Sequence, residues 1–213
     1  MQEFEHIAPA DIEKTSFSII AKELSEKNIS LPQELAPVIM RVIHTTADFD
    51  YAESLKFSPD VLEIIKKAIL GGADIVTDTN MALAGINKKT LSRFGGEAHC
   101  FMADEDVAAR AKEQNLTRAA VSMKKARELS KPLIFAIGNA PTALVELCSL
   151  MENGFKPVAV IGVPVGFVNV VAAKKMIMKS GVPYIVNEGR KGGSTVAAAI
   201  CNAILYSISK EKS

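Results

Sequence analysis

The feature of the sequence that most restricts its fold is a regular alternation of short apolar runs with helical segments from Ala73 onward. Apolar strands joined by helical crossovers predict a mainly parallel sheet covered by helices on both faces, with right-handed connections. We therefore expect an α/β fold, a three-layer α/β/α sandwich around a mainly parallel five-stranded sheet. The predicted strands are Ala73–Thr77, Ala98–Met102, Leu133–Ile137, Val158–Ile161 and Tyr184–Val186.

Two helices are predicted near the start of the chain. The segment from Asp11 to Glu26 carries apolar residues at the spacing of an amphipathic helix. A second helix follows Pro32, and its apolar stripe places Arg41 and His44 three residues apart near its C-terminal end. Residues at this spacing are neighbours on one side of a helix.

A third helix is predicted to begin at Ser58-Pro59, read as an N-cap followed by proline at the first helical position, and to end at Gly71-Gly72. The sequence contains no linker rich in proline, glycine and serine between these helices and the rest of the chain. We therefore expect the N-terminal helices to pack on the sheet, with residues 1–213 forming a single domain.

Composition limits the kind of partner. A chain of 213 residues with 48% hydrophobic composition can bury one sizeable core. Its 25 basic and 24 acidic residues lack the basic excess that usually binds nucleic-acid phosphates. No apolar run approaches the roughly 18 residues that a membrane span needs. We expect neither nucleic acid nor membrane as a partner.

Cysteine use and the N-terminal sequence predict the compartment. Cys100, Cys148 and Cys201 are odd in number and far apart, and each lies in an apolar run. This pattern favours buried, reduced thiols over disulfides or zinc ligands. The sequence MQEFEHIAPADIEK has neither a basic leader nor a hydrophobic region. A cytoplasmic location is therefore expected.

The loops that follow the predicted strands are rich in glycine and polar residues. Open parallel sheets bind ligands outside the carboxyl ends of their strands, and free N–H groups at helix starts favour carboxylate or phosphate oxygens. An anionic ligand is thus expected, although tight strand-to-helix turns alone could also explain these glycines. Neither GxGxxG nor GxxxxGK[ST] occurs. The loops are Asp78–Asn80, Gly138–Thr142, Gly162–Gly166 and Glu188–Ser194.

Histidine is scarce enough for each one to be weighed separately. His6 lies in a terminus that we expect to be frayed, and His99 lies in the predicted strand EAHCFM, where a packed, hydrogen-bonded residue is expected. His44 ends the apolar stripe of the second helix. It is the candidate proton donor, with a purely structural helix-end histidine as the alternative.

The neighbours of His44 can influence its chemistry. Thr45, Thr46 and Asp48 follow it and could fix its tautomer or raise its proton affinity. No second histidine, cysteine, aspartate or glutamate stands at a recognisable ligand spacing from it, so no metal site is predicted.

Three arginines at predicted element boundaries are candidates for binding carboxylates. Arg41, Arg118 and Arg190 stand next to small or polar residues, where a guanidinium can bind a carboxylate through two hydrogen bonds. Solvation at the surface is the alternative for each of them.

Six segments, taken in order, resemble the precorrin-8X methylmutase family, which includes the cobalt-precorrin-8 methylmutases. The segments read RVIHTTADFDYAESLKFSP, GADIVTDTNMALAGI, TRAAVSM, AIGNAPTALVEL, GVPVGFV and GRKGGSTVAAAICNA, and the match runs from about Ile7 to Asn202. The resemblance implies an isomerase that shifts a methyl group from C-11 to C-12 of a corrin precursor, giving hydrogenobyrinic acid or its cobalt-containing counterpart, cobyrinic acid. It also implies no added cofactor, a homodimer and tight retention of the product.

The resemblance assigns the family's catalytic histidine to His44 and its substrate-contacting serine and arginine to Ser16 and Arg41. A corrinoid substrate carries many carboxylates around an apolar macrocycle, so several anion-binding loops around one wide cleft fit it. An imidazolium at His44 would protonate or hydrogen-bond a ring nitrogen. The other candidate substrate-binding residues are Thr45, Asn80, Thr117, Arg118, Asn139, Thr142, Gly166, Arg190, Lys191, Gly193 and Ser194.

One segment departs from the family pattern. After GVPVGFV the family usually has a glycine or alanine stretch and then Glu-Ser-Lys, whereas here the chain reads Asn169 to Lys174 without the acidic residue. Two other functions are alternatives. One is an α/β enzyme acting on a phosphorylated metabolite, which the glycine loops allow but the missing nucleotide motifs argue against. The other is a non-catalytic corrinoid carrier that has the same fold without the reaction. Since the macrocycle would hold the cobalt, both metal-free and cobalt-containing substrates fit the sequence.

Overall fold

The computed structural model describes residues 8–9 and 11–211, so His6 and the expected fraying of its segment lie outside the described part. Within these residues the strands are β1 (Leu55–Phe57), β2 (Asp74–Thr77), β3 (Ala98–His99), β4 (Leu133–Ile137), β5 (Ala159–Gly162) and β6 (Tyr184–Asn187). They form one six-stranded sheet in the order β1-β6-β5-β4-β2-β3. Neighbours from β6 to β3 pair in parallel, and β1 pairs antiparallel with β6.

The predicted α/β fold is confirmed, but the predicted number of five strands is wrong, because β1 adds a sixth at the edge. This strand contains three residues, with Lys56 between two apolar side chains, which is too short for its periodicity to be recognised. The predicted strand Ala98–Met102 ends at His99. Beyond it the chain turns, and Asp104 N donates a hydrogen bond to the Phe101 carbonyl.

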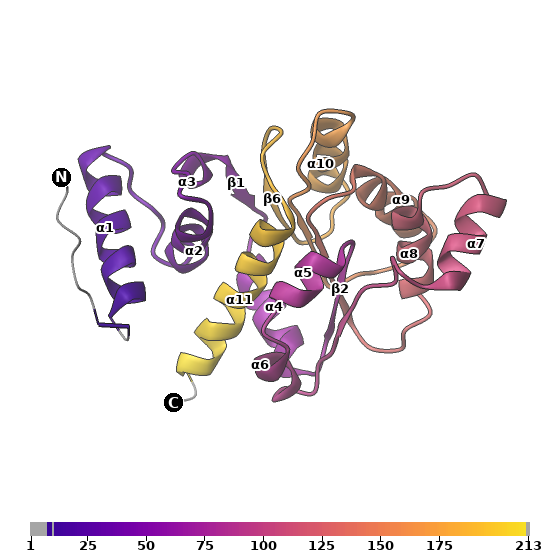
Figure 1. The fold of residues 1–213 in the computed structure, drawn as a ribbon, viewed down its shortest axis with the longest axis horizontal. Helices are drawn as coiled ribbons and strands as arrows, with labels where there is room; N and C mark the ends of the chain where they lie inside the picture. Colours follow the sequence, from indigo (N-terminus) through magenta and orange to yellow (C-terminus); the bar gives the residue numbers. More distant parts are fainter. Residues whose placement is uncertain (1–7, 10, 212–213) are drawn as a thin grey trace.

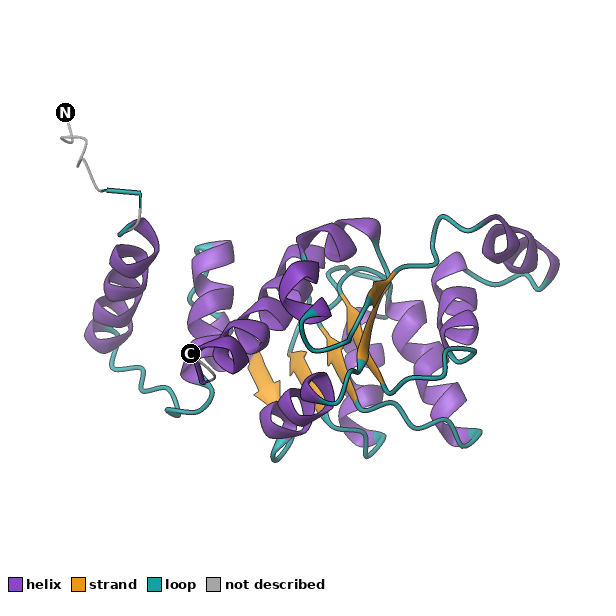
Figure 2. Cartoon of the chain, turned by 90° about the horizontal axis from the view of Figure 1, so that it is seen from below, coloured by secondary structure: helices purple, strands orange, loops and turns teal. Residues whose placement is uncertain are grey.

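Side-chain alternation along the strands explains the helical layers on both faces of the sheet. In β4, Ile134 and Ala136 belong to one core and Leu133, Phe135 and Ile137 to the other, and all five are buried. Successive side chains of a strand point to opposite faces, so a wholly apolar strand needs cover on both. Figure 2 shows the strands enclosed by helices.

Each face of the sheet has its own set of helices. The larger core joins one face to helices near both ends of the described chain: α2 (Ala36–Thr46), α4 (Val61–Leu70), α6 (Lys88–Ser92) and α11 (Ser194–Glu211), with α5 (Asn80–Gly85) packed on α11. The second core joins the opposite face to α8 (Arg118–Ala126), α9 (Pro141–Glu152) and α10 (Val170–Lys179). Outside α8 lies α7 (Glu105–Glu113).

The N-terminal helices extend the first layer sideways. The helix α2 packs against α11, and α1 (Ile12–Glu26) packs against α2 and contributes Ile20 and Leu24 to the same core. A single turn, α3 (Tyr51–Ser54), connects α2 to β1. In Figure 1, α1 lies at one end of the molecule and α7 at the other. The predicted packing of the N-terminal helices on the domain is therefore confirmed.

The predicted start of the third helix, now α4, is wrong by two residues. Ser58 does not cap it: its hydroxyl oxygen accepts a hydrogen bond of 2.9 Å from Tyr184 N at the sheet edge. Asp60, with a left-handed φ of 56°, precedes the first helical residue, Val61. The predicted end is correct, since Gly71 caps the helix and Gly72 has a φ of 85°.

Other sequence predictions concern residues of the core. All three cysteines are free, but Cys100 is half-buried rather than buried. Burial raises the pKa of the Cys201 thiol to about 12. The predicted hydrogen bond of His99 is present: its Nε2 lies 3.1 Å from Asp74 Oδ2. Of the helices that the structure describes, none combines the length and the apolar character needed to cross a membrane.

Candidate active site

His44 lies in the last turn of α2 with its side chain exposed. Its ring stacks on Phe17 of α1, with 5.4 Å between ring centroids and 21° between planes. The helix ends because Ala47 adopts a left-handed φ of 53° and its N–H donates to the Ile43 carbonyl. His44 therefore lies at the C-terminal end of α2, where the helix dipole carries its partial negative charge.

Arg41 lies one helical turn before His44 and contacts the same aromatic ring. Its guanidinium carbon is 4.9 Å from the centroid of Phe17 and 5.4 Å from that of Tyr206. Its Nη2 is 2.7 Å from Glu13 Oε1. The arginine is thus held between α1, α2 and α11, where its side chain keeps 17% exposure.

A cavity of about 810 Å³ lies beside Arg41, lined by residues of α1, α2 and α11 that include Phe17, Met40 and Tyr206. This volume falls in the range of roughly 300–1,000 Å³ that small-molecule sites occupy. Two predicted substrate contacts lie on helices α1 and α2, outside the lining of this cavity. Within their own helices, Ser16 Oγ donates to the Ile12 carbonyl at 2.9 Å and Thr45 Oγ1 to the Arg41 carbonyl at 2.8 Å.

The loop after β2 and the loop after β6 contact each other through two side-chain hydroxyls, those of Thr79 and Ser194. Thr79 Oγ1 accepts from Ala82 N at 3.0 Å and so caps α5, and it lies 2.7 Å from Ser194 Oγ at the start of α11. Asn80, the first residue of α5, is exposed beside this pair. Gly193 N donates to the Val163 carbonyl at 2.9 Å, which ties the same region to the loop after β5.

Asp78, which the sequence analysis did not single out as a site residue, organises the loop after β4. Its buried carboxylate accepts hydrogen bonds from three successive backbone N–H groups: Gly138 at 2.8 Å, Asn139 at 2.8 Å and Ala140 at 2.6 Å. Burial raises the pKa of Asp78, while these hydrogen bonds oppose the rise. The expectation that these amides would be free for a ligand anion is therefore wrong.

Several side chains around the loop bound by Asp78 remain exposed and can contact a ligand. Asn139 is exposed, and Thr142 Oγ1 accepts from Thr117 Oγ1 at 2.9 Å, which joins the starts of α9 and α8. Thr117 also caps α8 by accepting from Ala120 N, and Arg118 follows it with an exposed side chain. Among the described residues, no contact connects this group directly to His44.

The loop after β5 is exposed and apolar. Phe167 keeps 82% exposure and Val168 keeps 78%. Arg190 of the loop after β6 places its guanidinium carbon 5.4 Å from the Phe167 ring centroid, and its carbonyl accepts from Gly166 N at 3.2 Å. Gly166 has a φ of 151°, a conformation that favours glycine. The two loops thus present an arginine and an aromatic ring together.

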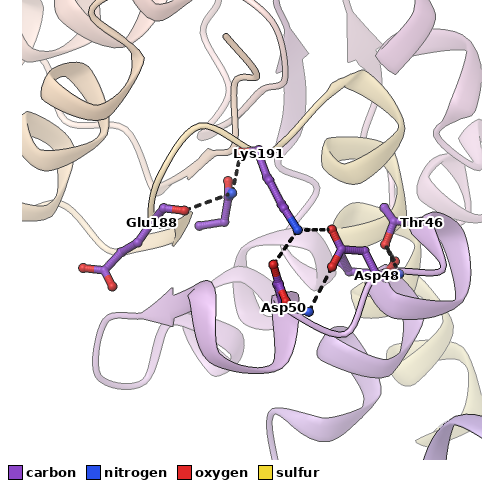
Figure 3. A network of polar contacts seen from close by, with 7 residues as sticks. Thr46, Asp48, Asp50, Glu188 and Lys191 are labelled. Atoms are coloured by element: carbon purple, nitrogen blue, oxygen red, sulfur yellow. Dashed lines mark hydrogen bonds and ion pairs between the residues drawn. The ribbon is translucent and has the colours of Figure 1, made fainter. Parts of the chain in front are cut away.

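Lys191 joins the loop after β6 to the turn that follows His44. Its Nζ lies 2.5 Å from Asp48 Oδ2 and 2.5 Å from Asp50 Oδ2, as Figure 3 shows. The two carboxylates raise the pKa of Lys191, and the hydrogen bond from Lys191 lowers the pKa of Asp48. Asp48, expected from the sequence to act on His44, is instead bound to Lys191.

These features match a known family. A model of the precorrin-8X methylmutase family covers residues 11–207. The chain belongs to this family. It is 46% identical over 204 residues to the cobalt-precorrin-8 methylmutase of Salmonella typhimurium, covering 93% of this chain and 95% of the relative.

Two further comparisons support membership of the methylmutase family. The cobalt-precorrin-8 methylmutase of Priestia megaterium is 45% identical over 199 residues, which cover 93% of this chain and 88% of the relative. The solved structure of precorrin-8X methylmutase from Thermus thermophilus superposes with a TM-score of 0.85 at 38% identity, covering 94% of this chain and 98% of that one. The resemblance stated from the sequence motifs is therefore confirmed.

Within this methylmutase fold, the predicted site residues fall into two groups. One surrounds Phe17 on α1 and α2, and the other lines the carboxyl edge of the sheet. Lys191 links them, because its backbone belongs to the sheet edge and its ammonium binds the turn after α2. Asp78 and Lys174, both buried, support the sheet-edge group and were missed as site residues.

Proposed function

We propose that the chain catalyses the methyl shift from C-11 to C-12 of precorrin-8X or cobalt-precorrin-8, giving hydrogenobyrinic acid or cobyrinic acid. The observation that carries this proposal is the placement of an exposed His44 on the ring of Phe17, one turn from Arg41, in a member of the methylmutase family. A proton donor and a carboxylate-binding group thus share one aromatic ring, and both Arg41 and Phe17 line the cavity beside them.

In the proposed mechanism His44 acts as the general acid. The imidazolium donates a proton or a hydrogen bond to a ring nitrogen, which makes the macrocycle electron-poor and favours migration of the methyl group. The bond to C-11 breaks as the bond to C-12 forms, and the proton then returns from the ring nitrogen to His44, so that the acid is regenerated. General acid catalysis of this kind contributes on the order of 10²–10⁴ in rate. The reaction needs no added cofactor.

Phe17 holds the imidazole in place in this mechanism. Stacking of His44 on Phe17 fixes the plane of the ring, and Arg41 on the same aromatic ring sets the distance between the acid and the nearest substrate carboxylate. Because methyl migration is intramolecular, orientation of one substrate suffices, and no second reactant has to be bound.

The peripheral carboxylates of the substrate are assigned to arginines. Arg41 binds one carboxylate near the acid, and Arg118 and Arg190 bind others along the carboxyl edge of the sheet. Guanidinium groups suit this role because they bind a carboxylate through two parallel hydrogen bonds. The exposed Phe167 beside Arg190 supplies an apolar surface for the macrocycle.

We further propose a cytoplasmic homodimer. The free thiols support a reducing compartment, since oxidising compartments favour disulfides. Exposed apolar residues on α1, Ile12 and Ile19 with about half of their surface accessible (51% and 52%), support burial of this helix against a second copy.

The test is incubation of the purified protein with metal-free and with cobalt-containing substrate in parallel, followed by absorbance scans and mass analysis. Turnover gives a time-dependent spectral change at unchanged mass, because the reaction is an isomerisation. A static spectral shift without further change identifies a corrinoid carrier and contradicts the proposal. The faster of the two substrates identifies the physiological one.

A further inference from the structure

Lys174 is a buried lysine on the apolar side of α10. It lies among Val170, Ala173 and Ile177, and it keeps 1% of its surface exposed. A buried ammonium is strongly unfavourable unless hydrogen bonds compensate for its lost hydration. Its position in an apolar stripe therefore requires a specific reason.

The ammonium group of Lys174 is bound by the loop after β6. Its Nζ donates to the Gly189 carbonyl at 2.9 Å and to the Lys191 carbonyl at 2.8 Å. The Lys191 carbonyl also accepts from Asn187 Nδ2, a buried amide at the end of β6. Gly189 has a φ of 80°, so the loop curls around the lysine in a conformation that favours glycine.

The same loop reaches the turn that follows His44. The Lys191 carbonyl accepts the hydrogen bond from Lys174 Nζ, and the Lys191 ammonium donates to Asp48 and Asp50, each at 2.5 Å. Asp50 N in turn donates to Asp48 Oδ1 at 3.0 Å, which closes the turn. Figure 3 shows Lys191 between the loop and the two aspartates.

A second contact joins the two segments through the backbone. Glu188 N donates to the Ser54 carbonyl at 2.7 Å, and Asn187 pairs with Leu55 in the β1–β6 ladder. Residues 188–191 therefore contact residues 48–54 at two points, through Lys191 and through Glu188 N. Asp48 stands four residues after His44, directly after Ala47, the residue at which α2 ends.

We propose that Lys174 is a positioning residue for the methyl shift: its ammonium holds the loop 188–191 in the conformation from which Lys191 binds Asp48 and Asp50, and it thereby fixes the segment that carries His44. The effect on catalysis rests on the proposed function. The effect on the two segments does not, and can be measured without any substrate.

Protonation of Lys174 is compatible with this role. Burial lowers the pKa of Lys174 to about 8, so the group is still mainly charged at neutral pH. A charged donor makes stronger hydrogen bonds to carbonyl oxygens than a neutral one. Lys175, the next residue, is exposed on the same helix and offers a matched control.

The experiment compares Lys174→Met, Lys174→Arg and Lys175→Met with the wild type by hydrogen–deuterium exchange and by steady-state turnover. In Lys174→Met we expect exchange of residues 46–54 and 188–193 to rise about tenfold or more while the strands stay protected. We expect kcat to fall by roughly 10- to 100-fold, since a misplacement of about 1 Å can have this effect. Lys174→Arg should retain part of the exchange protection and part of the kcat that Lys174→Met loses. Lys175→Met should match the wild type in both measurements.

A double variant separates positioning from general loss of stability. Lys191→Met should raise exchange of residues 46–54 and leave residues 188–190 protected. Adding Lys174→Met to Lys191→Met should then loosen residues 188–190 but raise exchange of residues 46–54 much less than it does alone, because the two substitutions act through one path. If Lys174→Met does not fold, Lys174→Arg and Lys191→Met carry the same comparison.

Two results would overturn the proposal. Wild-type exchange of residues 46–54 in a folded Lys174→Met variant shows that the lysine does not control this turn. Fully additive effects in the double variant show that it acts on global stability only. Absence of turnover in the wild type contradicts the proposed function instead, and leaves the exchange results to decide the positioning role.

Discussion

Asp78→Ala tests whether one buried carboxylate holds the loop between β4 and α9. In the wild type this carboxylate accepts from the N–H groups of Gly138, Asn139 and Ala140 at 2.6 to 2.8 Å. Alanine leaves all three donors without their partner. A buried donor left unsatisfied costs about 1–3 kcal/mol, but the more exposed Asn139 and Ala140 can be reached by water.

The expected loss in the free energy of unfolding is therefore roughly 1–3 kcal/mol, set mainly by Gly138. Asp78→Asn should lose less, because its amide oxygen can still accept from the buried Gly138 N–H, while its amino group faces the more exposed N–H groups of Asn139 and Ala140. Urea denaturation of both variants measures these losses. Asp11→Ala is the control: Asp11 is exposed, makes no side-chain cap, and should change stability by less than about 0.5 kcal/mol.

A loss below about 1 kcal/mol in Asp78→Ala would refute the reasoning, since it would mean that water or a shifted loop satisfies all three amides. Product binding by the same variant gives a second, functional measurement. The loop carries Asn139 and leads to Thr142, both candidate substrate contacts. Product affinity should fall in Asp78→Ala at temperatures where the variant is still folded.

Three further predictions concern the His44 side of the site. His44→Asn should lower single-turnover conversion by about 10²-fold or more and change product affinity much less, because it removes only the transferable proton; near-normal turnover would eliminate His44 as the acid. Arg41→Ala should weaken product binding by roughly 1.5–3 kcal/mol in a titration, the value of a charged hydrogen bond. Lys191 lowers the pKa of Asp48, so this pair stabilises the fold at neutral pH and its contribution is lost as pH falls through that lowered pKa. Urea denaturation of Asp48→Asn should lack this acid-dependent part.

The sheet and most of its helices could be predicted because their apolar patterns are long and regular. The strand Leu133–Ile137 is apolar at every position and could only be a doubly covered strand. The start of α4 could not be predicted in the same way. The sequence predicts Ser58 as a helix cap, but its hydroxyl accepts a hydrogen bond from Tyr184 N of β6 instead. These two residues are distant in sequence, so local spacing cannot show the contact.

The candidate site was predictable mainly through the family motifs. His44 and Arg41 share a helix face, which spacing shows, but their common contact with Phe17 depends on how α1 packs. Lys174 left a signal that was overlooked: it occupies an apolar stripe with Val170 and Ile177, where a lysine is unexpected. Asp78 directly follows a buried strand, but spacing alone cannot show that it binds the next loop.

The pairing of β1 with β6 has a consequence for the order of folding. The turn after His44 is completed by residues near the other end of the described chain, through Leu55 and Asn187 in the ladder and through α2 against α11. Contacts between distant residues form slowly, because the entropy of closing a long loop must be overcome first. During synthesis on the ribosome, α1 and α2 emerge well before their partners β6 and α11. Their apolar faces therefore stay exposed to solvent until β6 and α11 have been synthesised. A nascent chain is most prone to aggregate while such surface is exposed.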